Sequence, residues 1–355
     1  MAIKIIGTGR AIPPNRASND DLAAQMDTTD EWIKSHTGIS FRHIADENVA
    51  CSDLAAEAAK NALAFVSGYT GTDCTQRDKV AAEIAGTIDM IVLATATADH
   101  FGTPSTACIV QHDIGANGAA AMDITAGCTG FVYGLETAAG LLSINKQRKR
   151  ALVIGSEILT KMTDWSDRRT CVLFGDGAGA VVIEKTDEES GSGLDRSSGL
   201  IQTLLFADGS GKESLVMRRG GTRNPYKKGE VIDAGIHIEM NGQEVYNFAV
   251  KAITDVISAL METKIEGFGN ITIDDITWIV PHQANARIVA AARRRLRIPA
   301  EKFYMNIEEY ANTSAATIPI ALDEMNRSGK LKKGDLILTV GFGGGLTYGG
   351  NIIIW

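Results

Sequence analysis

The chain has 355 residues, of which 45% are hydrophobic and 22% are charged, and it carries a formal net charge of −8. This length suits two domains or one large duplicated domain, and the negative charge argues against a general nucleic-acid-binding protein. The cysteines are odd in number and form no Cys-x-x-Cys pair, which indicates reduced thiols rather than a disulfide framework or a zinc site. They are Cys51, Cys74, Cys108, Cys128 and Cys171.

The chain shows no pattern of a targeting or membrane-spanning segment. Met1 leads directly into a short apolar stretch without the long apolar core of a signal peptide. No apolar run approaches the roughly 18 residues that a membrane span needs. We therefore expect a cytoplasmic protein that binds neither membranes nor nucleic acids.

Apolar strands and helical patterns alternate along the first half of the chain. Strands are expected at residues 3–7, 89–94, 119–124, 151–154 and 181–184. Helices are expected at residues 19–26, 29–34, 53–65, 104–112 and 131–142. Residues 67–86 are polar and lack periodicity, so we expect an exposed excursion there. Residues 186–198 are acidic and rich in Gly and Ser, which favours a connection between two halves.

The stretch around Cys128 joins an apolar strand to a helix. Residues 119–124 indicate a buried strand, and the helical pattern of residues 131–142 follows after a turn of small residues. Unpaired backbone N–H groups and the helix dipole at such a place favour a thiolate. We therefore expect Cys128 to ionise more readily than a free cysteine and to act as a nucleophile. For a cysteine taken alone, the alternative is a small buried residue that packs a strand end.

The second half of the chain repeats the order of segments found in the first. The corresponding pairs are residues 89–93 with 275–280, 128–142 with 312–325, 151–154 with 335–339, and 175–184 with 343–355. Four matches in the same order predict a duplicated α/β fold with mixed sheets covered by helices. The predicted halves are residues 1–187, with the nucleophile, and residues 188–355.

Three candidates from the second half are expected at the same end of the sheets as Cys128. His282 follows a strand and precedes a helix, a place that suits a structural or a catalytic histidine. Asn312 begins the helix that corresponds to the Cys128 helix, where an ordinary N-cap is the alternative. Glycines 343–345 leave backbone N–H groups open to an oxyanion, although such loops also serve as tight turns. Their convergence on one end of the sheets favours catalysis.

Four motifs together resemble β-ketoacyl-acyl carrier protein synthase III, the priming condensing enzyme of type II fatty-acid synthesis in the thiolase superfamily. They are AGCTGF at 126–131, PHQAN at 281–285, NTSAA at 312–316 and GFGGG at 341–345. The resemblance covers essentially the whole chain and implies a thiolase-like αβαβα fold. Chain-elongating synthases have a second His in place of Asn312. Degradative thiolases have a second Cys in the C-terminal glycine-rich loop, where this chain has none.

The resemblance implies a reaction and a role for each motif. Cys128 would take the acyl group of an acyl-CoA, acetyl-CoA by default, while the N–H groups of Cys128 and Gly344 form an oxyanion hole. His282 and Asn312 would then hydrogen-bond the thioester oxygen of malonyl-acyl carrier protein as CO₂ leaves and the carbanion attacks. Phe342 would lie near the departing carboxylate. CoA thioesters are substrates in this reaction, and no metal or redox cofactor is required.

The resemblance also implies contacts with CoA. Trp32 and Arg168 match the pair that holds the adenine ring between an aromatic face and a guanidinium. Gly242, Tyr246 and Asn285 match positions that line the pantetheine tunnel. Tyr246 replaces a commoner Phe and also suits a core position.

Further expectations concern macromolecular partners. A run of arginines follows the His282 motif and would dock the acidic carrier protein, with a solvated helix face as the alternative. These residues are Arg287, Arg293, Arg294 and Arg295. Residues 97–103 match the segment that closes the acyl pocket across a homodimer interface, with Phe101 as its gate. His36 stands where an arginine is usual, which alters one CoA contact.

Two alternative functions remain. One is a related Cys-His-Asn condensing enzyme that uses a branched, medium-chain or dicarboxylate primer in a specialised pathway. A cationic side chain in the acyl pocket would favour the dicarboxylate. The other is a non-catalytic acyl-CoA-binding protein on the same fold, which the retention of all three catalytic residue types disfavours.

Overall fold

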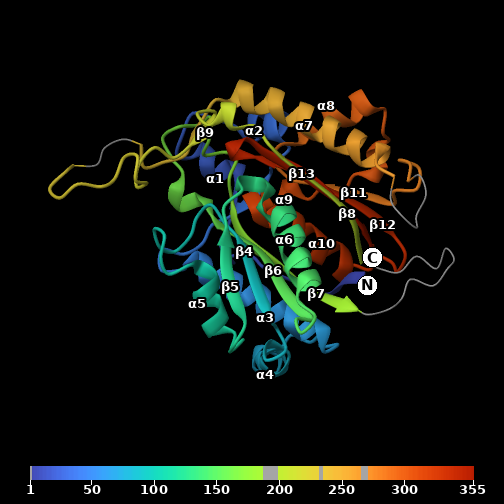
Figure 1. Ribbon diagram of the computed structural model, residues 1–355. Helices are drawn as coiled ribbons and strands as arrows, with labels where there is room; N and C mark the ends of the chain where they lie inside the picture. Colours follow the sequence, from blue (N-terminus) through green and yellow to red (C-terminus); the bar gives the residue numbers. More distant parts are fainter. Residues whose placement is uncertain (1, 187–198, 232–234, 265–270) are drawn as a thin grey trace.

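The computed structural model describes residues 2–186, 199–231, 235–264 and 271–355 (Figure 1). Its first sheet has the strand order β1-β7-β6-β4-β5. These strands are β1 Ala2–Ala11, β4 Met90–Ala94, β5 Ala120–Ile124, β6 Arg150–Ile158 and β7 Asp176–Thr186. Strand β4 is parallel to β5 and β6, whereas β7 is antiparallel to both β6 and β1.

The second sheet has the order β11-β12-β13-β8, which repeats the plan of the first. Its strands are β8 Gly199–Ala207, β11 Trp278–Pro281, β12 Leu336–Gly343 and β13 Thr347–Ile354. A parallel pair, β11 and β12, is again followed by two antiparallel strands. The predicted duplication is confirmed at this level. The predicted boundary at 187/188 lies outside the described residues and stays a prediction.

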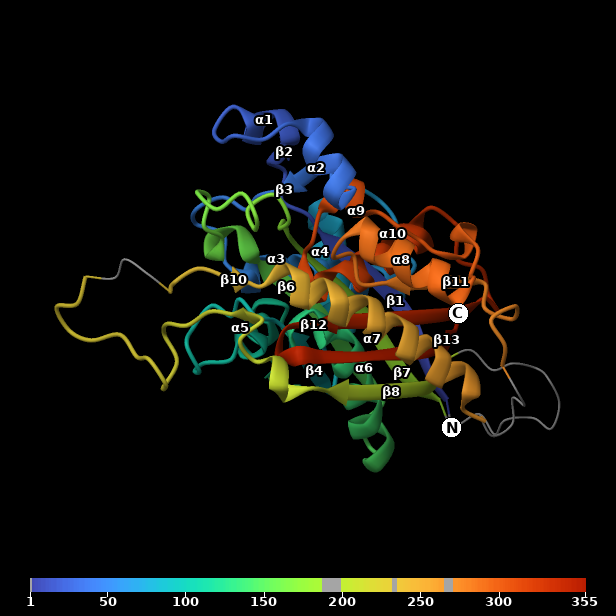
Figure 2. The ribbon, with the colours of Figure 1, turned by 90° about the horizontal axis from the view of Figure 1, so that it is seen from above.

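Helices form three layers around the two sheets (Figures 1 and 2). Helices α6 Gly130–Ile144 and α10 Thr317–Arg327 lie between the sheets, because each contacts strands of both. Helices α3 Cys51–Val66 and α5 Thr106–Asp113 cover the outer face of the first sheet. Helix α7 Gly242–Glu262 covers the second sheet and packs on α8 Ala286–Leu296. The αβαβα layering and the α/β fold class are therefore as predicted.

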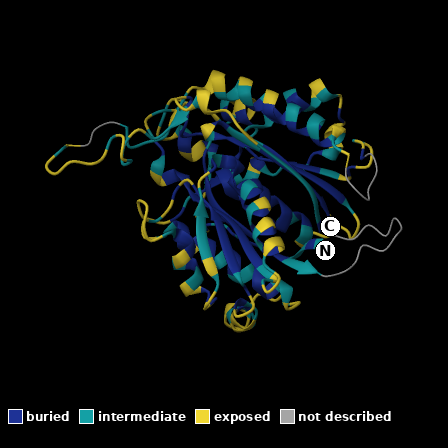
Figure 3. Cartoon of the chain, in the orientation of Figure 1, coloured by how far each residue is buried: buried dark blue, intermediate teal, exposed yellow. Residues whose placement is uncertain are grey.

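The apolar surfaces of the central layer explain why the sheets stack. Helix α6 buries Phe131, Val132 and Leu135 in one cluster with residues of both sheets, such as Val153 and Ile353. Because the middle helices have a sheet on each side, they carry apolar residues around most of their circumference. Buried residues accordingly run through the centre of the molecule (Figure 3).

Short elements complete the chain. The helices are α1 Asn19–Ala23, α2 Asp30–Thr37, α4 Cys74–Ala85 and α9 Ile307–Tyr310. The strands are β2 Arg16–Ser18 with β3 Phe41–His43, and β9 Leu215–Val216 with β10 Glu239–Met240. Helix α2 contacts α8 of the second half, whereas α1 lies farther out (Figure 2).

Two sequence expectations need correction. Residues 67–86 are mostly exposed, as expected, but they contain helix α4, which the sequence analysis missed. Asp73 caps this helix, which buries Ala81 and Ala85 beside α3. Its small apolar face is only alanines and two half-buried residues, so the periodic signal is weak. Strand β5 is not a buried strand either. It is the edge of the first sheet, and its residues are half-buried or exposed in this chain.

Candidate active site

Cys128 lies in a 3₁₀ turn, η1 Gly127–Thr129, between β5 and α6. This turn contacts a second one, η6 Gly344–Leu346, between β12 and β13. Gly127 has a φ of +51°, and a Cβ on it would lie 2.9 Å from Gly344 N. A Cβ on Gly343 would lie 2.6 Å from Cys128 N. Glycine is thus required on both sides of the contact that brings the two halves together at Cys128.

Burial raises the pKa of the Cys128 thiol to about 11. Hydrogen bonds from the Ser314 hydroxyl and from the N–H groups of Cys128 and Gly344 act in the opposite direction but are weaker. The expectation that Cys128 ionises more readily than a free cysteine is therefore wrong for the free protein. The sulfur is desolvated, and α6 begins two residues later than the thiol. The two N–H groups expected in an oxyanion hole do converge on this sulfur.

His282 follows the end of β11 and is 1% exposed. Burial lowers the pKa of His282 to about 3, so the ring is neutral at physiological pH. The Phe342 and His282 rings meet edge to face, with centroids 5.1 Å apart and an interplanar angle of 64°. Because the imidazole is buried and contacts an apolar ring, a positive charge on it is unfavourable.

The Thr317 hydroxyl controls which nitrogen of His282 carries the proton. Its Oγ lies 2.7 Å from His282 Nδ1 and donates to Ser314 O at 3.0 Å. In that arrangement Nδ1–H donates to the hydroxyl, and Nε2 carries a lone pair. If the hydroxyl turns to donate to Nδ1, the proton moves to Nε2, which becomes a donor. A single rotation therefore selects between two forms of the same neutral imidazole.

Asn312 lies before the turn η5 Ser314–Ala316, which leads into α10. Its Oδ1 accepts a hydrogen bond from Ser314 N at 2.8 Å. Its backbone N–H donates to Leu173 O, and its carbonyl accepts from Gly175 N. With Oδ1 engaged, the Nδ2 donor is the end of the amide that remains for the cavity. Asn312 is therefore not the N-cap of α10, which is Ala316; its side chain closes the turn at Ser314 and presents a donor to the site.

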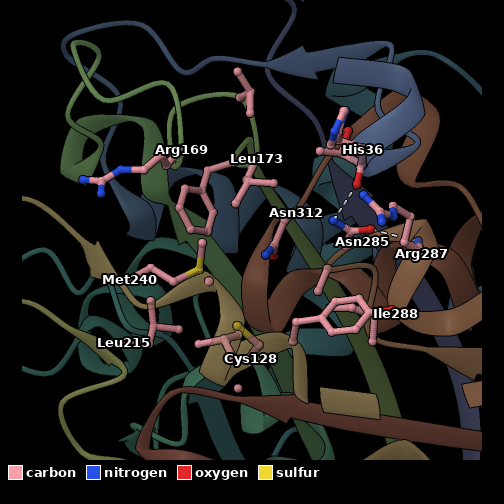
Figure 4. Close-up of a pocket in the computed structure, with 18 of the residues that line it drawn as sticks. His36, Cys128, Arg169, Leu173, Leu215, Met240, Asn285, Arg287, Ile288 and Asn312 are labelled. Carbon is pink, nitrogen blue, oxygen red and sulfur yellow. Dashed lines mark hydrogen bonds between the residues drawn. The ribbon is translucent and has the colours of Figure 1, made fainter. Parts of the chain in front are cut away.

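One cavity unites most of the predicted site residues (Figure 4). Cys128, His282, Asn312 and Phe342 all line it. The other predicted residues that line it are Trp32, Gly242, Tyr246, Asn285 and Arg287. Residues from both halves therefore build a single site, as the motif convergence predicted.

Asn285 links the N-terminal helices to α8 at the side of this cavity. Its Oδ1 caps α8 by accepting from Arg287 N at 2.8 Å, and its Nδ2 donates to His36 O at 3.0 Å (Figure 4). The His36 ring stacks on Trp32, with centroids 4.4 Å apart. His36, which replaces the usual arginine, therefore lies against the Trp32 indole that was expected to hold the adenine ring.

Arg168 lies close to Trp32, with its guanidinium carbon 5.6 Å from the indole centroid. It also donates to Asp27 O at 2.8 Å. A planar ring between them needs about 3.5 Å on each side, so the pair must separate to admit adenine. The neighbouring Arg169, which the sequence did not single out, lines the cavity instead.

A second cavity reaches Cys128 from the other side. It is lined by small and apolar residues that include Ala126, Leu159, Leu215 and Met217, and by Thr97. None of the described residues that line it is charged. Cys128 therefore lies where two cavities meet.

Two predicted features lie away from Cys128, the Phe101 gate and the three consecutive arginines of α8. Phe101 is 73% exposed, faces Gly220 and lines neither cavity of its own chain. Arg294 and Arg295 are exposed on α8, and Arg293 is half-buried there. Their predicted roles involve other molecules and stay predictions.

Three polar residues of the site were missed by sequence reasoning. Ser314 lies within the NTSAA motif at 312–316 and Thr317 follows it directly, but the resemblance assigned a role only to Asn312. Glu157 is a carboxylate within an apolar strand, and this could have marked it. Among the described residues, no three His, Cys, Asp or Glu side chains gather to hold a metal ion. No helix in the described ranges is long and apolar enough to cross a membrane.

Comparisons with known proteins agree with this geometry. A family model described as 3-oxoacyl-[acyl-carrier-protein] synthase III matches residues 122–209, and a model of its C-terminal part matches residues 268–355. The β-ketoacyl-[acyl-carrier-protein] synthase III of Caldanaerobacter subterraneus is 46% identical over 100% of this chain and 98% of the relative. The chain belongs to the 3-oxoacyl-[acyl-carrier-protein] synthase III family.

Solved structures of the family have the same fold. The synthase III of Aquifex aeolicus matches with a TM-score of 0.82 and 39% identity, over 99% of this chain and all of that one. The priming β-ketosynthase of the R1128 polyketide pathway matches with a TM-score of 0.82 and 30% identity, over 99% and 96%. The chain is thus an acyltransferase of the condensing type, as predicted.

Proposed function

We propose that this chain condenses an acyl-CoA primer with malonyl-acyl carrier protein to give 3-oxoacyl-acyl carrier protein, CoA and CO₂, and so initiates fatty-acid synthesis. The observation that carries the proposal is the convergence of Cys128, His282 and Asn312 on one cavity. The names of the relatives support it.

In the first step, Cys128 Sγ attacks the thioester carbon of the acyl-CoA. The N–H groups of Cys128 and Gly344, which converge on the sulfur in the free protein, donate to the oxyanion. Loss of one such donor typically lowers the rate about 10²–10³-fold. The C–S bond to CoA then breaks, the acyl group stays on Cys128, and CoA leaves and takes up a proton.

In the second step, malonyl-acyl carrier protein occupies the first cavity. The Thr317 hydroxyl turns to donate to His282 Nδ1, so that Nε2 carries the proton. The electrons of the breaking C–C bond form an enolate, whose oxygen accepts hydrogen bonds from His282 Nε2–H and Asn312 Nδ2. A histidine with a pKa of about 3 stabilises this oxygen without protonating the carbanion. The apolar Phe342 ring favours neutral CO₂ over the carboxylate. The carbanion then attacks the acyl-cysteine, so the electron balance needs no metal or redox cofactor.

The second cavity suits the acyl group of the primer. Its described lining residues carry no charge, which favours a neutral acyl chain, acetyl by default, over a dicarboxylate. A branched or medium-chain primer in a specialised pathway remains the second candidate. The similarity to a priming β-ketosynthase of a polyketide pathway supports this second candidate.

We further propose the partners and location of the protein. The arginines of α8 dock the acidic carrier protein beside the cavity opening, where Arg287 also lies. Two copies pair along β5, and Phe101 of one protomer gates the acyl cavity of its partner. The half-buried edge strand and the exposed phenyl ring support this assembly. The protein acts in the cytoplasm, with residues 1–187 and 188–355 as its two halves.

Intact-mass measurement tests the proposal. The protein is incubated with acetyl-, butyryl-, branched-chain and glutaryl-CoA, beside the Cys128→Ala variant. An acetyl adduct that is absent from the variant supports the assignment. A preference for a longer, branched or carboxylated group keeps the chemistry and changes the primer. Absence of every adduct would refute Cys128 as the nucleophile.

A further inference from the structure

Glu157 is a carboxylate on β6 that is wholly buried, with 0% exposure. The ion pairs found among the described residues do not include it. The other residues of β6 after Arg150 are buried and uncharged, so the strand itself does not require a carboxylate. Because burial of a carboxylate without a cation is costly, its hydrogen bonds must compensate for that cost.

The Glu157 side chain extends the contact between β6 and β4 beyond the end of β4. Strand β4 pairs with β6 as far as Ala94. The next N–H, of Thr95, donates to Ile124 O on the β5 side, at 3.2 Å. The N–H of Ala96 donates instead to the Glu157 carboxylate, at 3.1 and 3.2 Å from its two oxygens. A side chain thus replaces the backbone acceptor that the sheet no longer supplies at this point.

Thr97 attaches the same loop to β6 a second time. Its hydroxyl donates to Glu157 Oε2 at 2.7 Å and accepts from Ile158 N at 2.9 Å. Its N–H donates to Thr95 Oγ at 3.0 Å, and that hydroxyl donates to the same carboxylate oxygen at 3.3 Å. One carboxylate therefore binds three successive residues, 95–97.

The loop that Glu157 binds forms part of the wall of the second cavity. Ala96 and Thr97 line this cavity together with Cys128, whereas Glu157 is not among the described residues that line it. The carboxylate therefore lies behind the wall. Since protein interiors are closely packed, a small shift of this loop changes the space that the cavity offers.

We propose that Glu157 is a positioning residue that fixes Ala96 and Thr97 in the wall of the second cavity and thereby limits the length of the acyl group that Cys128 accepts. The inference rests on the proposed function, which places the primer in this cavity. Glu157 does not touch the primer and acts through the residues that it binds. A carboxylate suits this task because both of its oxygens are acceptors, whereas one end of an amide of the same size is a donor.

The test compares the rates at which acetyl-CoA and butyryl-CoA acylate Cys128, followed by intact-mass measurement. In Glu157→Gln, an N–H group faces the Ala96 N–H or the Thr97 hydroxyl in place of an acceptor. The released wall can retreat from the longer chain, which acetyl does not require. We expect the ratio of the butyryl rate to the acetyl rate to rise about tenfold, a size typical of one methylene group in an apolar pocket.

Thr97→Val tests the same contact from the side of the wall. Valine keeps the shape of the side chain but removes the hydroxyl that donates to Glu157. The rate ratio should rise in this variant too. The double variant should not exceed Glu157→Gln by more than about twofold, because the two residues act through one contact. If Glu157→Gln does not fold, Thr97→Val decides.

The matched control is Asp89→Asn, just before the opposite end of β4. Asp89 Oδ2 also accepts from backbone N–H groups, of Lys149 at 2.7 Å and of Arg150 at 3.0 Å, and Asp89 lines neither cavity. Its rate ratio should equal that of the wild type. A purely structural role of Glu157 would lower both rates together. An unchanged or lower ratio in Glu157→Gln would therefore overturn the proposal, as would additive effects in the double variant.

The inference and the proposed function fail in different ways. Acylation of Cys128 with the same rate ratio in the wild type and in Glu157→Gln refutes the role of Glu157 alone. Absence of acylation of the wild type by either ester refutes the proposed function.

Discussion

At Cys128, desolvation and hydrogen bonding act on one thiol in opposite directions, and desolvation is the larger effect. The strand–turn–helix pattern in the sequence predicted a nucleophile, and its position at the meeting point of two cavities agrees with this. The pattern could not predict the direction of the pKa shift. Burial of the sulfur depends on η6, which lies more than 200 residues away in the chain.

Thr317→Val tests the control of the His282 proton. Valine keeps the shape of the side chain but removes the hydroxyl that contacts Nδ1 at 2.7 Å. We expect condensation kcat to fall about 10- to 100-fold, which corresponds to the ~1–3 kcal/mol cost of an unpaired buried polar group. Acylation of Cys128 by acyl-CoA should change much less.

The control is Thr254→Val on α7, which removes another threonine hydroxyl with a backbone acceptor. Condensation rates measured with pre-acylated protein check the prediction. Equal losses in acylation and condensation would show that Thr317 supports the fold of the site rather than the imidazole.

At the scale of elements, long apolar segments were predictable and small or half-exposed ones were not. Strands β4, β6 and β12 each contain a continuous apolar run and were found. Helix α7 was missed, although its buried face is regular, because it follows residues with no clear pattern. Strand β5 was found but was assigned to the interior, because its alanines do not distinguish a core strand from an edge.

Helix α8 should contribute to carrier-protein binding more than to catalysis. Arg294→Glu combined with Arg295→Glu places acidic groups on its exposed side. We expect KM for malonyl-acyl carrier protein to rise about tenfold or more, with a weaker dependence on salt, because complementary charge accelerates encounter. Acylation by acyl-CoA should stay unchanged.

The matched control is Lys332→Glu with Lys333→Glu, a pair of exposed cations in the loop before β12. Steady-state kinetics at several salt concentrations compare the two double variants. A KM that rises equally in both would mean that net charge, and not the α8 surface, governs docking.

At the scale of the whole molecule, the sequence correspondences between the halves predicted the duplicated fold. The four matched segments became β4 with β11, α6 with α10, β6 with β12, and β7 with β13. The way in which two copies of the chain would pair could not be predicted in the same manner. It depends on which strand is left at the edge of the first sheet, and strand order follows from packing rather than from local pattern.

Ala121→Pro tests whether β5 joins two copies. Ala120 N–H donates to Asp89 O on the β4 side, so alternation along the strand points the N–H of Ala121 to the open edge. Proline there removes an outward donor and leaves the β4 ladder intact. We expect sedimentation to show a shift from dimer to monomer, with an unchanged circular dichroism spectrum. A dimer of unchanged stability would exclude β5 as the interface.

Under the proposed function, the two cavities that meet at Cys128 also fix the order of events. A pantetheine arm that reaches the sulfur fills the first cavity, so CoA must depart before the carrier protein can deliver its malonyl group. The acyl group waits meanwhile in the second cavity, out of the path of the incoming arm. CoA and the carrier protein therefore never occupy the first cavity at the same time, and the acyl-cysteine bond at Cys128 connects the two half-reactions.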